Sequence, residues 1–223
     1  MGAFSQLSAY FTEGIVAVAR KLRYSEENLL ILQNKERELQ CRFPKTYENL
    51  LSCEHNKDYR TPMEYGQDLV ASWVFEDYTM QALLNAGLDI EKAGADKNRT
   101  ILPHAKISAH SDYFVTWCDE KVLLELMSDY TGFWARENRM HLRNDKYLAL
   151  KEHNSLFLGI DTQGKKFLFL DFTEPMRAQY IEHHRPYGDK PAYEITLPDG
   201  ILKPLKMERI IKQIKLAIVS RQF

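Results

Sequence analysis

The chain has 223 residues, of which 44% are hydrophobic and 27% are charged, and its formal net charge is -1. This composition is typical of a globular protein and argues against a disordered, collagen-like or coiled-coil chain. No run of about 18 uncharged apolar residues is present, so a membrane span is not expected. The three cysteines are scattered, which favours a reducing compartment. We therefore expect a cytoplasmic protein.

The first 62 residues predict helices. Residues 1–40 follow helical spacing with a break at 24–27, where Ser25 can cap the helix that follows. A polar connection over 43–62 then leads into the rest of the chain. We assign residues 1–62 to an N-terminal helical region.

The remaining residues, 63–223, predict both helices and strands. In chain order the expected elements are a helix over 63–85, strands over 113–117 and 122–127, a helix over 146–153, strands over 156–160 and 167–172, and a last helix from Pro204 to about Ser220. The segment 88–102 is expected to be irregular, and the segment 173–202 is expected to form a long connection. This order predicts the α/β class, with a mixed β-sheet flanked by helices. One single domain that includes the N-terminal helices is the alternative.

Charge is distributed unevenly along the chain. Residues 54–91 carry eight acidic and two basic side chains, whereas residues 201–223 carry six basic and one acidic side chain. The acidic segment could collect a metal ion or be solvated, and the basic segment could meet phosphate groups.

Glu76 is the first candidate functional residue. It projects into the apolar stripe of the helix expected over 63–85, where burial of an uncompensated carboxylate costs several kcal/mol. Such a carboxylate is paired with an arginine or a backbone donor, faces the solvent edge of the stripe, or binds a cation. The sequence leaves these three interpretations open.

Asp112 and Glu125 come from the hairpin expected over 113–127. A two-residue turn at 119–120 would make them diagonal neighbours on one face, roughly 7 Å apart. A loop of odd length would separate them. Glu125 also interrupts an apolar run, which indicates a buried strand, although an edge strand with Glu125 facing water is the alternative. Two carboxylates at this range can hold one Mg²⁺ or Mn²⁺.

This arrangement resembles the PD-(D/E)XK nuclease superfamily, which is restriction-endonuclease-like. In that family an Asp and a second acidic residue on a bent hairpin bind Mg²⁺, and an upstream helix often donates a further Glu. The resemblance covers roughly residues 63–172, about half of the chain, and includes the helix and strand that follow the hairpin. It implies that Glu76, Asp112 and Glu125 hold the metal, and that Asp112 and Glu125 are catalytic.

Met127 departs from the family pattern. A lysine two places after the second acid assists the attacking water in the family, and methionine cannot donate a hydrogen bond to water or phosphate. Three explanations remain open. Lys146 on the next helix replaces the missing lysine as a catalytic residue, the chain is an inactivated variant, or the motif is coincidental.

Four basic residues, Arg136, Arg139, Arg143 and Lys146, are spaced by 3, 4 and 3 positions. On one continuous helix they would fall within about 80° of one another and form a cationic stripe for nucleic-acid phosphates. A helix break at 144–145 would instead leave the arginines on a loop that could reach a DNA groove. A solvated face paired with neighbouring acids is the third interpretation.

Together these residues predict a Mg²⁺-dependent (or Mn²⁺-dependent) DNA endonuclease, of restriction type or related, that hydrolyses phosphodiester bonds. Duplex cleavage usually uses a two-fold dimer that matches the symmetry of DNA, so a homodimer is expected. The alternatives are a non-catalytic nucleic-acid-binding protein on a nuclease-like fold and an α/β interaction protein without a nucleic-acid role. His104 and His110, which precede Asp112, are further candidate metal ligands.

Overall fold

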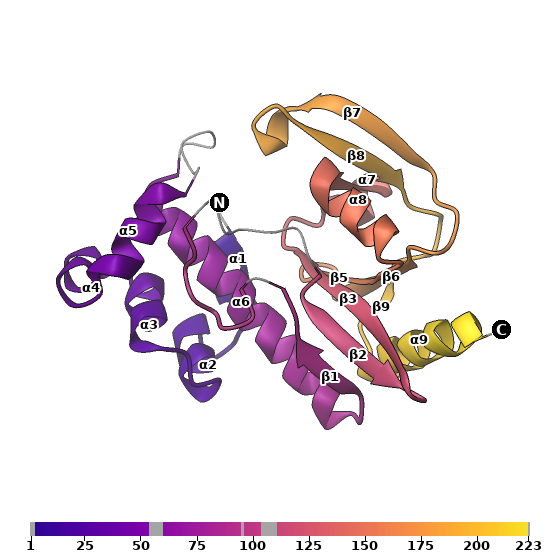
Figure 1. Cartoon of the computed structure of the whole chain (residues 1–223), viewed down its shortest axis with the longest axis horizontal. Helices are drawn as coiled ribbons and strands as arrows, with labels where there is room; N and C mark the ends of the chain where they lie inside the picture. The colour runs from indigo at the N-terminus through magenta and orange to yellow at the C-terminus, as the bar shows by residue number, and fades with distance from the viewer. Residues whose placement is uncertain (1–2, 54–59, 95, 104–110, 223) are drawn as a thin grey trace. The chain divides into compact units, whose positions relative to one another are not determined.

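The computed structural model describes residues 3–53, 60–94, 96–103 and 111–222 (Figure 1). The chain forms two compact units, one made of residues 1–79 and 95–108 and the other of residues 80–94 and 109–223. The division falls inside the long helix α6 (Pro62–Asn85), and not at the 62/63 boundary expected from the sequence. His104 and His110 lie outside the described residues.

The first unit is helical. Before α6 it contains α1 (Ala3–Tyr10), α2 (Ile15–Lys21), α3 (Glu26–Leu32), α4 (Glu36–Arg42) and α5 (Pro44–Ser52). Ser25 caps α3 as expected, because its hydroxyl accepts a hydrogen bond from the backbone N–H of Asn28 at 3.4 Å. The segment 43–62 is not only a polar connection: Pro44 begins α5, whose Leu50 is fully buried.

The second unit is built on a mixed six-stranded sheet, which confirms the α/β class. Its strands lie in the order β1 (Asp89–Lys92), β2 (Tyr113–Trp117), β3 (Glu120–Asp129), β5 (Leu156–Asp161), β6 (Lys166–Asp171) and β9 (Lys203–Pro204). Only the pairing of β3 with β5 is parallel, and the chain makes this crossover through α8 (Asn144–Glu152). The strand β1 replaces part of the irregular segment expected over 88–102.

The β2–β3 hairpin has a different turn from the one expected. Tyr113 pairs with Leu124 and Trp117 with Glu120, so the two turn residues are Cys118 and Asp119. Both have positive φ, 51° and 65°, which is the backbone required by the tight hairpin turn that matches strand twist. The pairing moves by two residues relative to the expectation, which keeps every side chain on its expected face.

A second sheet has three antiparallel strands, in the order β4 (Arg139–Arg143), β8 (Lys190–Thr196) and β7 (Ala178–His184). Figure 1 shows β7 and β8 as a long hairpin beside α8, and residues of α8 contact β8 and β4. The segment 173–202, expected to form a long connection, is therefore largely β-strand. A core cluster joins this sheet to α8 and to the Glu125 face of the large sheet; it includes Met140, Leu142, Leu150, Phe157, Leu168, Phe172 and Ile195.

The last helix, α9 (Met207–Val219), begins three residues after Pro204, because residues 203–204 pair with β6 as β9. It buries Ile210, Ile214 and Ile218 and contacts β6 and β2. Among the described residues, no helix combines the length and the apolar character needed to cross a membrane.

Candidate active site

Asp112 and Glu125 lie at the open end of the β2–β3 hairpin, away from its turn. Asp112 directly precedes β2, and continuing the observed pairing by one residue places it opposite Glu125, nearer than the diagonal position expected from the sequence. Its Oδ2 accepts a hydrogen bond from the backbone N–H of Leu126 at 3.0 Å, and its carbonyl accepts one from Ala93 at 2.7 Å. The Glu125 side chain is only 5% exposed, so the strand is buried rather than at an edge.

Lys146 joins this carboxylate pair from the first turn of α8. Its Nζ lies 2.9 Å from each oxygen of Glu125, and its side chain is 14% exposed. Burial alone would lower the pKa of this ammonium, but the Glu125 and Asp112 carboxylates outweigh burial and raise the pKa above its usual value. The lysine is therefore charged and acts as the counter-ion of both acids.

Two serines tie the site to its supporting elements. Ser111, immediately before Asp112, and Ser155, immediately before β5, are buried, and their hydroxyl oxygens lie 3.2 Å apart. The backbone N–H of Ser155 donates to the carbonyl of Leu150 in α8 at 2.9 Å. The residue before Asp112 is thus linked to the helix that carries Lys146, which restricts the relative movement of the two functional groups.

The donor chemistry of this cluster fits a small divalent cation. Asp112 and Glu125 converge on a buried positive charge, that of Lys146, and carboxylate oxygens are the ligands that Mg²⁺ and Mn²⁺ prefer. Mg²⁺ commonly binds proteins through one or two carboxylates and keeps several waters. Across the described ranges, no group of three or more His, Cys, Asp and Glu side chains is arranged to hold a metal. The residues therefore fit a site of two protein carboxylates completed by solvent.

Glu76, the expected third carboxylate, belongs to the helical unit. Its Oε2 lies 3.0 Å from Nη1 of Arg99, whose Nη2 lies 2.7 Å from Asp77. This is the arginine pairing that the sequence left open as an alternative to metal binding. Arg99 is distant in sequence from the apolar stripe of α6, and no periodicity identifies such a partner.

The cationic stripe expected from Arg136, Arg139, Arg143 and Lys146 is wrong, because these residues do not share a helix. Arg136 lies in α7 (Phe133–Glu137), Arg139 and Arg143 in β4, and Lys146 in α8. In β4 the two arginines alternate with buried Met140 and Leu142, and this alternation with a period of two was the missed signal.

The three arginines pair with neighbouring acids, as the solvated-face alternative expected. Arg136 lies 3.1 Å from Glu137, Arg139 lies 2.9 Å from Glu194, and Arg143 lies 3.3 Å from Asp145. These exposed pairs reduce the positive charge that the arginines offer to phosphate.

Met127 occupies an apolar environment on the same face as Glu125. It packs against the core cluster and pairs with Gly159 of β5. A Cβ added at Gly159 would lie 2.5 Å from the ring of Trp134, so the indole fills the space above this glycine. Met127 is therefore packed against the core, and the ammonium group that contacts Glu125 is that of Lys146.

A cluster on the second sheet was not expected from the sequence. His141 Nε2 lies 3.0 Å from Glu194, and the rings of His141 and His184 are 4.4 Å apart. The hydrogen bond to His141 lowers the pKa of Glu194, and burial together with His141 lowers the pKa of His184. The pairing of β4 with β8 brings these residues together, and only an alternating pattern in both strands could have indicated it.

No family model matches this sequence. No curated protein matches it either.

Proposed function

We propose that this protein is a metal-dependent endonuclease that hydrolyses phosphodiester bonds in DNA. The observation that carries the proposal is the convergence of Asp112, Glu125 and Lys146. Two acids from the β2–β3 hairpin and a lysine from α8 form one cluster, in which the Lys146 ammonium contacts Glu125 and lies close enough to Asp112 for both carboxylates to raise its pKa.

The order of elements supports a restriction-endonuclease-like fold. A long helix (α6) precedes the β2–β3 hairpin that carries the acids, and the helix α8 and the parallel strand β5 follow it. The resemblance to the PD-(D/E)XK superfamily implies the same succession of helix, hairpin, helix and strand. The chain differs in that β4 and α7 lie between the hairpin and α8.

Asp112 and Glu125 would hold the Mg²⁺ or Mn²⁺, which when bound supplies electrostatic stabilisation of phosphate charge and acidifies water. Lys146 then serves as the donor that the family places at position 127. An ammonium is a hydrogen-bond donor, so it can orient the attacking water or donate to a phosphate oxygen. The hydrogen bond from the backbone N–H of Leu126 orients the Asp112 carboxylate.

Cleavage of supercoiled plasmid in excess Mg²⁺ tests the proposal. We expect the wild-type protein to cleave, and Asp112→Asn and Lys146→Met to lower the rate by about 100- to 1000-fold, because each removes charge stabilisation from the transition state. Lys121→Met is the matched control, since Lys121 lies on the same face of β3 but is half exposed and pairs with Glu91. Its rate should stay within a few-fold of wild type.

Binding measurements separate this proposal from the non-catalytic alternative. A folded wild-type protein that shifts DNA in a gel but cleaves none in Mg²⁺ or Mn²⁺ would be a nucleic-acid-binding protein on a nuclease-like fold. Cleavage of both strands would further predict a homodimer, detectable by sedimentation on DNA.

A further inference from the structure

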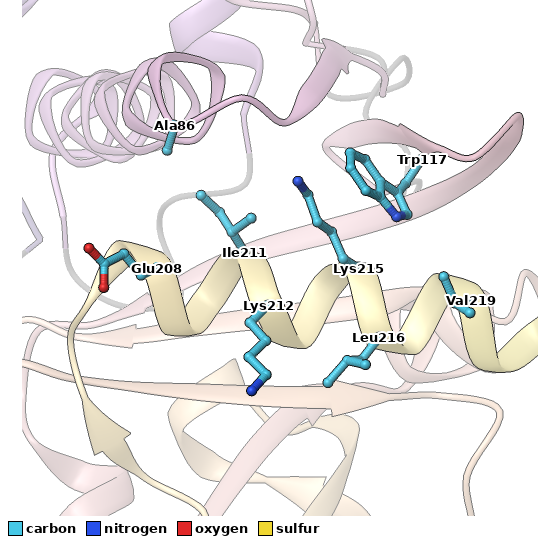
Figure 2. Close-up of a pocket in the computed structure, with 8 residues that line it drawn as sticks. All are labelled: Ala86, Trp117, Glu208, Ile211, Lys212, Lys215, Leu216 and Val219. Carbon is cyan, nitrogen blue, oxygen red and sulfur yellow. The ribbon is translucent and has the colours of Figure 1, made fainter.

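A groove runs along α9 on the second unit. It has a volume of about 550 Å³ and lies between α9, the end of α6 at Ala86 and the tip of the β2–β3 hairpin at Trp117. Figure 2 shows Ile211 and Lys215 directed from α9 towards Ala86 and Trp117, with Leu216 and Lys212 on the adjoining flank of the helix. Trp117 shares its face with Tyr113 and Val115, opposite to the face of Glu125, so the sheet separates the groove from the candidate active site.

The walls of the groove are apolar. The buried side of α9 consists of Ile210, Ile211, Ile214 and Ile218, yet Leu216 remains 58% exposed and Val219 half-buried along the groove. Covering an exposed leucine removes apolar surface from water, which is favourable. The groove therefore presents apolar surface that an apolar side chain of a partner would cover favourably.

The rim of the groove is positively charged. From residue 203 to residue 215 the chain carries five basic residues and one acid, Glu208. Lys212 is exposed at the groove, and the Lys215 ammonium lies 3.5 Å from the centre of the Trp117 ring. A partner that fits must combine apolar anchors with negative charge beside them.

A peptide meets these requirements better than nucleic acid does. Single-stranded nucleic acid binds by stacking bases on open aromatic faces, but the Lys215 ammonium covers a face of Trp117. The groove follows α9 from Glu208 to Val219, which at 1.5 Å per residue is about 16 Å, the length of three helical turns. We infer that this groove docks an acidic amphipathic helix of a partner protein, with its apolar side chains on Leu216 and Val219 and its carboxylates beside Lys212 and Lys215.

Fluorescence anisotropy with the full-length protein tests the inference. The probe is a labelled peptide of about 12 residues with Leu at helical positions i, i+3, i+4 and i+7 and Glu at most others. We expect saturable binding that Lys212→Glu and Leu216→Ser each weaken at least about tenfold, with circular dichroism confirming that both variants are folded. Lys45→Glu is the matched control, because it reverses a fully exposed charge on α5 and should leave binding unchanged.

Two further probes give the outcomes that would overturn the inference. A peptide with Lys in place of every Glu should not bind, and a single-stranded DNA of about 12 nucleotides in about tenfold excess should not displace the labelled Leu/Glu peptide, since DNA held at the candidate active site lies on the other face of the sheet. Displacement of the peptide by the DNA would make the groove a phosphate site. Absence of Leu/Glu peptide binding, or equal binding by the Lys peptide, would remove the acidic-helix proposal. Each result is independent of whether the protein cleaves DNA.

Discussion

Two clusters in this protein pair a buried basic side chain with carboxylates, and they differ in whether arginine or lysine supplies the positive charge. Arg99 in the helical unit is 8% exposed and meets Asp77 through two of its nitrogens, at 2.7 and 3.1 Å. Lys146 in the α/β unit is nearly as buried and meets Glu125. The first cluster has the properties of a structural crosslink, and the second is the cluster proposed above to hold a metal ion.

The guanidinium group of Arg99 is shared among several acids. The planar guanidinium also lies 3.0 Å from Glu76 and 3.4 Å from Asp96, so its donors are spread over three acids. Tyr24 donates a hydrogen bond to Asp77 at 2.9 Å, and burial together with the Asp77 charge raises the pKa of Tyr24. Each of these side chains therefore contacts at least one other member of the network.

The Lys146 cluster, in contrast, places one ammonium beside two carboxylates, Asp112 and Glu125, and Asp112 is only half-buried. Lysine is a compact point charge on a flexible stem, without the fixed fork of arginine. We expect such a site to admit a divalent cation beside its acids more readily than the Arg99 network, whose guanidinium contacts are directional.

The largest expected effect is on the stability of the helical unit. Arg99→Ala leaves Asp77 and Glu76 buried without their cation, which typically costs about 3–5 kcal/mol of unfolding free energy. Urea denaturation monitored by circular dichroism measures this loss. Arg42→Ala is the matched control, because Arg42 pairs with two acids on the exposed surface and its loss should change stability far less. Equal losses in both variants would show that the Arg99 network is not the crosslink described above.

A smaller effect is expected on the Lys146 cluster when metal is added. Mn²⁺ at ten times its dissociation constant should stabilise the protein by roughly 1.4 kcal/mol, because it binds only the folded state. Thermal melts with and without Mn²⁺ measure this shift. Asp112→Asn should abolish it, and Lys146→Met should increase it, since the two carboxylates then repel each other without a counter-ion. An unchanged shift in Asp112→Asn would place the metal elsewhere.

The smallest effect is expected at Met127. If Lys146 supplies the ammonium, Met127→Lys should change the rate of Mg²⁺-dependent cleavage by less than about tenfold, which corresponds to 1.4 kcal/mol of barrier. The substitution should also lower the melting temperature, because it brings a charge into the apolar cluster around Trp134. Single-turnover cleavage and a thermal melt measure the two quantities. A large gain in rate would instead mean that Lys146 is not the catalytic donor.

The sequence predicted the hairpin and the face shared by Asp112 and Glu125 because these depend on local patterns. The alternation of Tyr113 to Trp117 identifies β2, and a two-residue turn of either position keeps Asp112 and Glu125 on one face. The turn itself was placed one residue late, because nothing in the composition of Cys118 and Asp119 indicates that both adopt positive φ.

What the sequence did not predict depends on long-range packing. The sequence could not predict the contact of Lys146 with Glu125, because the two residues lie 21 positions apart. The pairing of Glu76 with Arg99 spans an irregular segment in the same way. The strands β7 and β8 were missed for a different reason: prolines and histidines at 183–191 conceal a bulged hairpin.

Trp134, which packs closely against Gly159, is an intrinsic fluorescent probe. The indole is 5% exposed and its ring centre lies 6.4 Å from that of Phe157, the residue paired with Glu125. An indole enclosed in this way emits at short wavelength, and its emission responds to changes in the electric field around it. A single residue without a side chain in β5 therefore determines where this fluorophore lies, and its emission can report rearrangements around β5, the partner strand of β3, without any added dye.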